Sequence, residues 1–315
     1  MIEERNIPIR QILTEMLKNK TGRDIRVEVI NDAYAGDYAE FCPEGALGHL
    51  KTGEVGMSLI IGNGVGGVLM MKTRSGKLVV CPGGDEPGHR RVPWSIIDQL
   101  KLGYLTRKQC GCTVVGDPLL QTGPCLEKLT QGPSMEWIMK RRTGRPDITN
   151  KWITNFLREV TGFRPGLAAA FETDGQAADP ALLKAIFALK GAPGRRSALL
   201  SASITGADLE ERELLADIFG VLSGEAYLLA NSLLTVQQGV ELSAGTTHVA
   251  LIGSAGHWYG PWLTPLMDEA VREQKELSQM TAWGLSPRFY VGKWQPDQTN
   301  LAGDAVYGAI LEGNK

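Results

Sequence analysis

A short stretch of the chain, from Cys81 to Glu127, concentrates side chains that bind metals. It holds four of the five cysteines and one of the four histidines. Cys110 and Cys112 are separated by a single glycine, too close for a comfortable disulfide but well placed to share one metal ion. One imidazole and three thiolates are a known ligand set for structural zinc. We therefore expect a zinc site here; the alternative is that these cysteines are ordinary buried thiols.

The cysteine count and the apolar segments indicate the compartment. Five cysteines, three of them clustered with a histidine, fit a reducing cytosol with a metal better than a secreted disulfide framework. The N-terminus is charged and lacks the apolar run of a signal peptide. The longest apolar stretch, residues 59–71, contains four glycines and is too short to span a bilayer. We expect a soluble cytoplasmic protein without a membrane partner.

Charge excludes one class of partner. The chain has 315 residues, 43% of them hydrophobic and 22% charged, which is typical of a globular protein. Its net charge of −2 provides no excess of positive charge to attract nucleic acid, so we expect no nucleic-acid partner. The basic cluster at residues 140–145 is interpreted as the solvated end of a helix rather than a binding patch.

The hydrophobic pattern predicts strands and long helices, and therefore an α/β architecture. An Asn-Gly pair between β-rich runs predicts a hairpin of strands 57–61 and 65–71. Further strands are predicted at residues 25–30, 77–80, 248–252 and 289–291. Helices are predicted at residues 9–17, 33–41, 135–142, 150–160, 180–189, 208–238, 261–279 and 302–311, with a polar connector at 191–206.

Three polar motifs have the residue types needed for chemistry on a hydroxylated substrate. In Asn31-Asp32, the carboxylate can accept a hydroxyl proton and the amide can orient the substrate, although Asp32 can also be a helix N-cap. Residues 62–67 are rich in glycine and can approach a phosphate closely, or form a plain tight turn. Residues 86–89, Glu-Pro-Gly-His, can bind hydroxyl groups or form a solvated turn.

Taken together and in this order, the motifs resemble those of the ROK family of bacterial sugar kinases and sugar-responsive repressors. The motifs that carry the resemblance are Asn31-Asp32-Ala33, Gly62-Asn63-Gly64-Val65-Gly66-Gly67, Glu86-Pro87-Gly88-His89, Cys110-Gly111-Cys112, Cys125-Leu126-Glu127 and Leu251-Ile252-Gly253-Ser254-Ala255-Gly256. The resemblance runs over nearly the whole chain. It implies the actin-like ATPase (ribonuclease H-like) fold, and ATP-dependent phosphorylation of a hexose at its 6-hydroxyl.

The resemblance also implies roles for individual residues. Asp32 would be the catalytic base, and the sugar hydroxyls would be bound by Asn31, Glu86, His89 and Glu127. The nucleotide would be bound, with Mg²⁺ on its phosphates, by Gly62, Asn63, Gly64, Gly66, Gly253 and Ser254. Structural Zn²⁺ would be bound by His89, Cys110, Cys112 and Cys125. The implied partners are a hexose or an N-acylated hexosamine, and ATP.

The chain departs from the family pattern in three places. The family usually has threonine at the place of Asn63. Its third zinc cysteine follows Cys-x-Cys almost at once, whereas twelve residues, 113–124, intervene here. Its opening Asp-x-Gly-Gly-Thr phosphate loop is absent from this sequence. We therefore expect mainly the large C-terminal lobe, with a truncated small lobe. A truncated small lobe would expose apolar surface, so a homodimer is one expected outcome and aggregation the other.

The expected organisation has three parts. Residues 1–33 are a remnant of the N-terminal lobe, residues 34–299 are the large lobe with a zinc loop at 81–127, and residues 300–315 are a C-terminal helix that returns toward the small lobe. Three functional interpretations remain open. The first is a glucokinase-type hexose kinase impaired by the missing phosphate loop. The second is a non-catalytic sugar-binding protein or pseudokinase. The third is a zinc-stabilised α/β fragment without a ligand.

Overall fold

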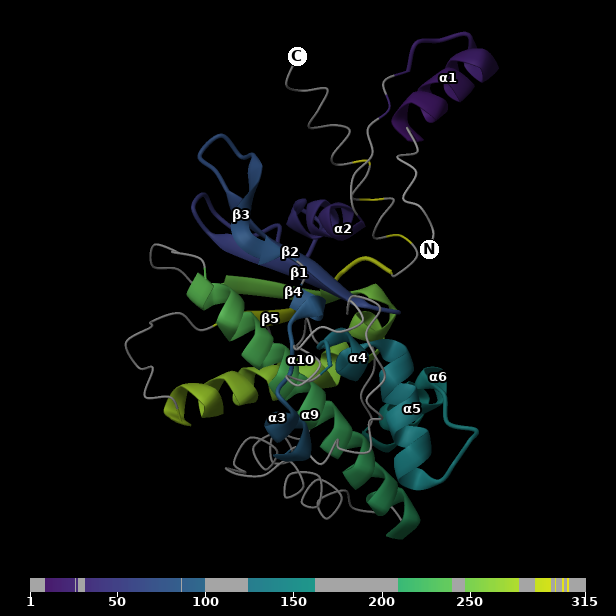
Figure 1. The fold of residues 1–315 in the computed structure, drawn as a ribbon, viewed down its shortest axis with the longest axis vertical. Coiled ribbons are helices and arrows are strands. Elements are labelled where there is room, and N and C mark those ends of the chain that lie inside the picture. Colours follow the sequence, from purple (N-terminus) through teal and green to yellow (C-terminus); the bar gives the residue numbers. More distant parts are fainter. Residues whose placement is uncertain are drawn as a thin grey trace, which may run out of the picture.

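A five-stranded mixed sheet forms the centre of the molecule (Figure 1). The computed structural model describes residues 9–25, 27, 32–85, 87–99, 124–161, 209–239, 247–277, 287–295, 298, 302 and 305. The strands are β1 (Val55–Ile61), β2 (Val65–Lys72), β3 (Leu78–Asp85), β4 (Thr247–Ile252) and β5 (Arg288–Val291). Their order across the sheet is β3-β2-β1-β4-β5.

The direction of the strands divides the sheet into two parts. Hairpins join β1 to β2 and β2 to β3, and the two strands of each hairpin run antiparallel. β4 runs parallel to β1, and β5 parallel to β4. The predicted hairpin is confirmed: Ile61 pairs with Val65, so Gly62–Gly64 forms a three-residue turn. The parallel pairing of β1 and β4 places their carboxyl ends at one edge of the sheet, beside this turn.

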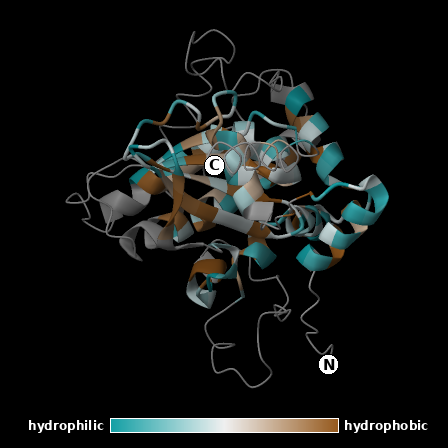
Figure 2. Cartoon of the chain, turned by 90° about the horizontal axis from the view of Figure 1, so that it is seen from above, coloured by the Kyte–Doolittle hydropathy of each residue, from teal (hydrophilic) through white to brown (hydrophobic). Residues whose placement is uncertain are grey.

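Helices cover both faces of the sheet (Figure 1). α2 (Asp32–Phe41) packs on one face, and α9 (Leu209–Gly239) and α10 (Gly253–Leu277) cover the other. Side chains alternate along the strands as period-2 geometry requires. In β4, for example, Val249 and Leu251 pack in the larger core while Ala250 and Ile252 face the α2 side. Figure 2 shows hydrophobic colour concentrated on the central strands and mixed colour on the outer helices.

Further helices surround the large core. They are α3 (Trp94–Gln99), α4 (Glu127–Thr130), α5 (Gly132–Thr143), α6 (Asn150–Thr161) and the 3₁₀ turn η1 (Pro87–His89). α1 (Ile9–Thr21) lies apart from this core, and its described side chains are mostly exposed (Figure 1). The predicted helices at 9–17, 33–41, 135–142, 150–160 and 208–238 are confirmed within a few residues. The predicted helix at 180–189, the connector at 191–206, most of the strand at 25–30 and most of the helix at 302–311 lie outside the described residues.

The start of α10 differs from the sequence expectation. The sequence predicts this helix over residues 261–279. In the structure it begins at Gly253, directly after β4, so Pro261 and Pro265 lie inside it. Gly253 has a φ of 78°, and a β-carbon there would lie 2.8 Å from the carbonyl oxygen of Ile61. Only glycine fits this conformation and this close approach, which lets the strand turn at once into the helix.

The described helices give no candidate for a transmembrane span, because none is both long and apolar enough to cross a bilayer.

Candidate sugar and nucleotide site

Three segments from distant parts of the sequence meet around the Gly62–Gly64 turn. A β-carbon placed on Gly64 would lie 3.2 Å from Oε2 of Glu127, the first residue of α4. On the other side of the turn, a β-carbon on Gly62 would lie 4.0 Å from Oγ of Ser254, in the first turn of α10. The fold thus brings together Glu127, the glycine turn and the Gly253–Ser254 segment, three of the segments that the sequence motifs singled out; that the last of these is a helix N-terminus was not predicted.

The position of this cluster follows from the sheet. The Gly62–Gly64 turn follows β1, and Gly253 follows β4, the parallel neighbour of β1. Ligands of open α/β sheets bind outside the carboxyl ends of the strands, where loops and helix N-termini face the solvent. A helix N-terminus presents unpaired N–H groups that attract anions. Gly66 lies in β2 beyond the turn, where it pairs with Ile60.

The segment from His89 to Val92 packs against residues 124–126, at the end of the predicted zinc loop. The amide of Val92 donates to the carbonyl of Pro124 at 2.9 Å, and the amide of Leu126 donates to the carbonyl of Arg90 at 2.8 Å. This short antiparallel bridge places the buried thiol of Cys125 3.5 Å from the backbone carbonyl oxygen of His89. Two of the four predicted zinc ligands, 36 residues apart, are therefore neighbours in space.

Glycine makes this packing possible. A β-carbon on Gly88 would lie 1.9 Å from the carbonyl oxygen of Val65, an overlap that no side chain could relieve. The 3₁₀ turn η1 can therefore lie directly on the start of β2, close to the Gly62–Gly64 turn. The hydroxyl of Ser232 on α9 reaches the carbonyl of Pro87 at 3.5 Å on the other side.

Only some of the remaining predicted site residues are among those that the structure describes. Asp32 is the first residue of α2. Asn31, Glu86, Cys110 and Cys112 lie outside the described residues. Among the residues that the structure does describe, no group of three or more His, Cys, Asp or Glu side chains is close enough to hold a metal. The donor types still fit: thiolates and imidazole are the ligands that zinc prefers.

The carboxylate of Glu127 lies beside a lysine and is partly buried. Its Oε1 lies 3.2 Å from Nζ of Lys128. Its Oε2 is the atom next to Gly64. An ionised carboxylate only accepts hydrogen bonds, so this atom suits a hydroxyl donor on a bound ligand.

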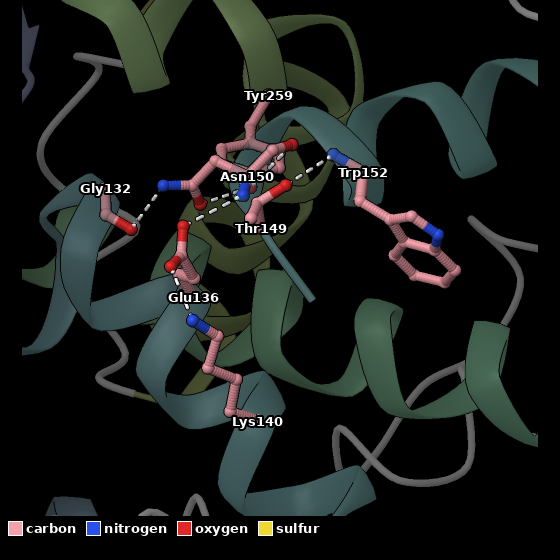
Figure 3. Close-up of polar contacts among 7 residues, drawn as sticks. All are labelled: Gly132, Glu136, Lys140, Thr149, Asn150, Trp152 and Tyr259. Atoms are coloured by element: carbon pink, nitrogen blue, oxygen red, sulfur yellow. Dashed lines mark hydrogen bonds and ion pairs between the residues drawn. The ribbon is translucent and has the colours of Figure 1, made fainter. Parts of the chain in front are cut away.

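A polar network beside the turn was not predicted from the sequence (Figure 3). The amide of Gly132 donates to the carbonyl of Gly62 at 2.8 Å. The side chain of Asn150 donates through Nδ2 to the carbonyl of Gly132 at 2.9 Å, and its Oδ1 accepts from the hydroxyl of Tyr259 at 2.6 Å. At the sequence level Asn150 marks only the start of a helix, because its partners are far away in the chain.

Glu136 anchors the same network from α5. Its Oε2 accepts from the backbone amide of Asn150 at 3.2 Å, and its Oε1 pairs with Lys140 at 2.8 Å. Burial raises the pKa of Tyr259 far above its ordinary value, and the nearby carboxylates of Glu225 and Glu136 raise it further. The tyrosine hydroxyl therefore keeps its proton and acts as a donor to Asn150.

Two solved structures resemble the chain over nearly its whole length. The ROK hexokinase from Thermus thermophilus is 18% identical with a TM-score of 0.52, and the alignment covers 98% of this chain and 72% of that chain. A ROK family protein from Streptococcus pneumoniae, solved in complex with sucrose, is 15% identical with a TM-score of 0.53, covering 96% and 71%. No protein-family model matches the chain, and no curated protein sequence is significantly similar to it.

These similarities establish the fold. The chain has the α/β fold of these ROK structures, as the sequence motifs led us to expect. It spans about seven tenths of the length of each of these two neighbours.

Proposed function

We propose that the protein binds a hexose and phosphorylates its 6-hydroxyl with ATP, in the manner of a glucokinase. The observation that carries the proposal is the meeting of Glu127, the Gly62–Gly64 turn and the Gly253–Ser254 helix start at one edge of the sheet. The carboxylate suits a hydroxylated ligand, and the turn and helix start suit a phosphate chain. A sugar-kinase-like fold supports both assignments.

In this proposal each motif has one task. The sugar hydroxyls are held by Asn31, Glu86, His89 and Glu127. The nucleotide lies against Gly62, Asn63, Gly64, Gly66, Gly253 and Ser254. Mg²⁺, bound with ATP, supplies charge neutralisation on the phosphates. An N-acylated hexosamine presents similar hydroxyl groups and is included in the substrate class.

The reaction requires positioning more than covalent chemistry. Asp32 accepts the proton of the 6-hydroxyl as the sugar oxygen bonds to the γ-phosphorus. The bond between that phosphorus and the bridging oxygen of the nucleotide breaks, and ADP leaves with the electron pair. The products are the sugar 6-phosphate, ADP and one proton.

We also propose structural zinc bound by His89, Cys110, Cys112 and Cys125. The contact between the thiol of Cys125 and the backbone of His89 supports it, because the bridge between Arg91 and Cys125 already brings the two residues together. Zinc bound there supplies a crosslink within residues 89–125. Glu127 follows Cys125 by two residues, so this crosslink would fix the side of the site on which Glu127 lies.

The second candidate is a sugar-binding protein without phosphoryl transfer. The observation that favours it is the absence of an Asp-x-Gly-Gly-Thr phosphate loop from the sequence. The Gly62–Gly64 turn can hold one side of a triphosphate, and an opposing loop is needed to hold the other.

Two measurements separate these candidates. Calorimetric titration with a panel of hexoses and N-acylated hexosamines tests sugar binding, and a coupled assay of sugar-dependent ADP release tests phosphoryl transfer. Turnover that requires both sugar and Mg²⁺ supports the kinase. Saturable sugar binding without ADP release supports the second candidate, and absence of any sugar binding rejects both.

A further inference from the structure

A continuous line of hydrogen bonds joins the two backbone segments assigned to the nucleotide. It runs from Gly62 in the turn to Gly132, from Gly132 to Asn150, and from Asn150 to Tyr259. Tyr259 lies on α10, the helix whose first turn contains Gly253 and Ser254. Figure 3 shows Asn150 between Gly132 and Tyr259, with its amide group in contact with both.

Gly132 lies where these segments come closest together. It is the first residue of α5, and a β-carbon there would lie 3.3 Å from the β-carbon of Ala255 in the first turn of α10. The same atom would lie 3.4 Å from the carbonyl oxygen of Gly62. The turn, the start of α5 and the start of α10 thus pack closely against one another, and a side chain at Gly132 would crowd both neighbours.

The amide of Asn150 suits this position because it both donates and accepts. Its Nδ2 donates to a carbonyl and its Oδ1 accepts from a hydroxyl, so its two ends are fixed by partners of opposite type. An aspartate of the same shape could accept from Tyr259 but could not donate to Gly132. An alanine could do neither. Glu136 holds the backbone amide of Asn150 and thereby fixes where this side chain starts.

We propose that Asn150 is a positioning residue for the nucleotide site, which fixes the Gly62–Gly64 turn relative to the start of α10 through Gly132 and Tyr259. The proposal rests on the proposed function for its ligand, but the positioning itself is a property of the protein without ligand. Asn150 sets the separation between two groups of backbone amides and touches neither sugar nor phosphate.

Hydrogen exchange on the full chain without ligand tests the positioning directly. Asn150→Ala and Asn150→Asp are expected to speed amide exchange in the peptide covering residues 59–70 about tenfold, because the hydrogen bond from the side chain to Gly132 is lost. Tyr259→Phe removes only the far end of the line and is expected to have a smaller effect in the same direction.

Thr149→Ala is the matched control. Thr149 caps the same helix, since its Oγ1 accepts from the amide of Trp152 at 3.1 Å, but it takes no part in the line from Gly62 to Tyr259. Thr149→Ala should speed exchange at the start of α6 and leave residues 59–70 unchanged. If both variants loosen the turn equally, Asn150 acts only through the stability of α6 and the proposal is wrong.

Ligand binding gives a second readout. Asn150→Ala should raise the dissociation constant for Mg²⁺ with a non-hydrolysable ATP analogue about tenfold, while that for the hexose stays within about twofold. Equal losses for both ligands would overturn the proposal. A wild-type chain that binds neither ligand refutes the proposed function, and the exchange of residues 59–70 then decides the positioning role by itself. If residues 59–70 exchange at the same rate in Asn150→Ala as in wild type, the positioning role of Asn150 is wrong.

Discussion

The Oε2 atom of Glu127 lies 3.2 Å from the point that a β-carbon on Gly64 would occupy. A carboxylate beside a phosphate-binding turn would repel the phosphate, unless the ligand presents hydroxyl groups to the carboxylate and phosphate elsewhere. Ser254 lies on the opposite side of the turn, next to Gly62. The turn therefore has an acidic side and a helix-start side, and in the proposed function the first would face the sugar and the second the nucleotide.

Glu127→Ala is expected to weaken hexose binding by about ten- to a hundredfold. A hydrogen bond to a charged group contributes about 1.5–3 kcal/mol, and alanine removes the acceptor completely. Calorimetric titration measures the effect. Glu44→Ala is the control, because Glu44 is exposed and belongs to the loop after α2. Unchanged affinity in Glu127→Ala would remove Glu127 from the sugar site.

Purified protein is expected to contain one zinc ion per chain. Cys125→Ser should lose the metal, because a hydroxyl is a poor substitute for a thiolate ligand, and it should unfold at a lower temperature. Cys42→Ser is the matched control: Cys42 is also a buried thiol, but it follows α2 on the other face of the sheet. Elemental analysis and thermal unfolding are the measurements. A fully folded zinc-free protein would contradict the prediction.

Asp37 is expected to make stability depend on pH. Its side chain is fully buried, its Oδ1 accepts from the amide of Ser58, and its Oδ2 has no hydrogen-bond partner. Burial raises the pKa of Asp37 well above its ordinary value, and the charge of Glu40 raises it further. Above about pH 4 the unfolded chain loses the Asp37 proton while the folded chain keeps it. The free energy of unfolding therefore falls as pH rises toward the folded-state pKa, by at most about 1.4 kcal/mol per pH unit.

Asp37→Asn should remove this dependence, because an amide resembles the protonated carboxyl and does not titrate. The difference in unfolding free energy between Asp37→Asn and wild type should grow in favour of the variant from pH 4 to pH 7. Denaturant unfolding at several pH values measures it. Glu40, Glu225 and Asp268 also have raised pKa values through burial, so only the difference between the two proteins isolates Asp37. A constant difference would show that Asp37 ionises normally.

Local patterns predicted the hairpin of β1 and β2, because a hairpin is specified by neighbouring residues. The Asn63-Gly64 pair between apolar runs predicted a turn between Ile61 and Val65, and the structure has the turn at these residues. The predicted start of α10, at Pro261, was wrong, because the true start depends on Gly253 approaching the carbonyl of Ile61, a contact between neighbouring strands. Sequence periodicity carries no information about such an approach.

Long-range contacts explain what was missed in the site. The partners of Asn150 lie 18 and 109 residues away, so its local context indicates only a helix start. His89 and Cys125 were paired through family resemblance rather than through spacing, and the bridge between their segments is consistent with that pairing. The roles of all the predicted site residues stay predictions, and Asn31, Glu86, Cys110 and Cys112 lie outside the described residues.

Asp32→Asn is expected to lower phosphoryl transfer about 10²- to 10⁴-fold, the usual contribution of a general base. The amide keeps the shape of the carboxylate and can still hydrogen-bond a hydroxyl, but it cannot accept the proton. Sugar affinity should therefore change little while turnover falls. Asp32 begins α2, so a loss of helix capping would instead appear as a lower unfolding temperature with near-normal turnover. Calorimetric titration, the coupled ADP assay and thermal unfolding, measured on the same preparation, distinguish the two roles, and near-normal turnover would leave Asp32 with only the structural one.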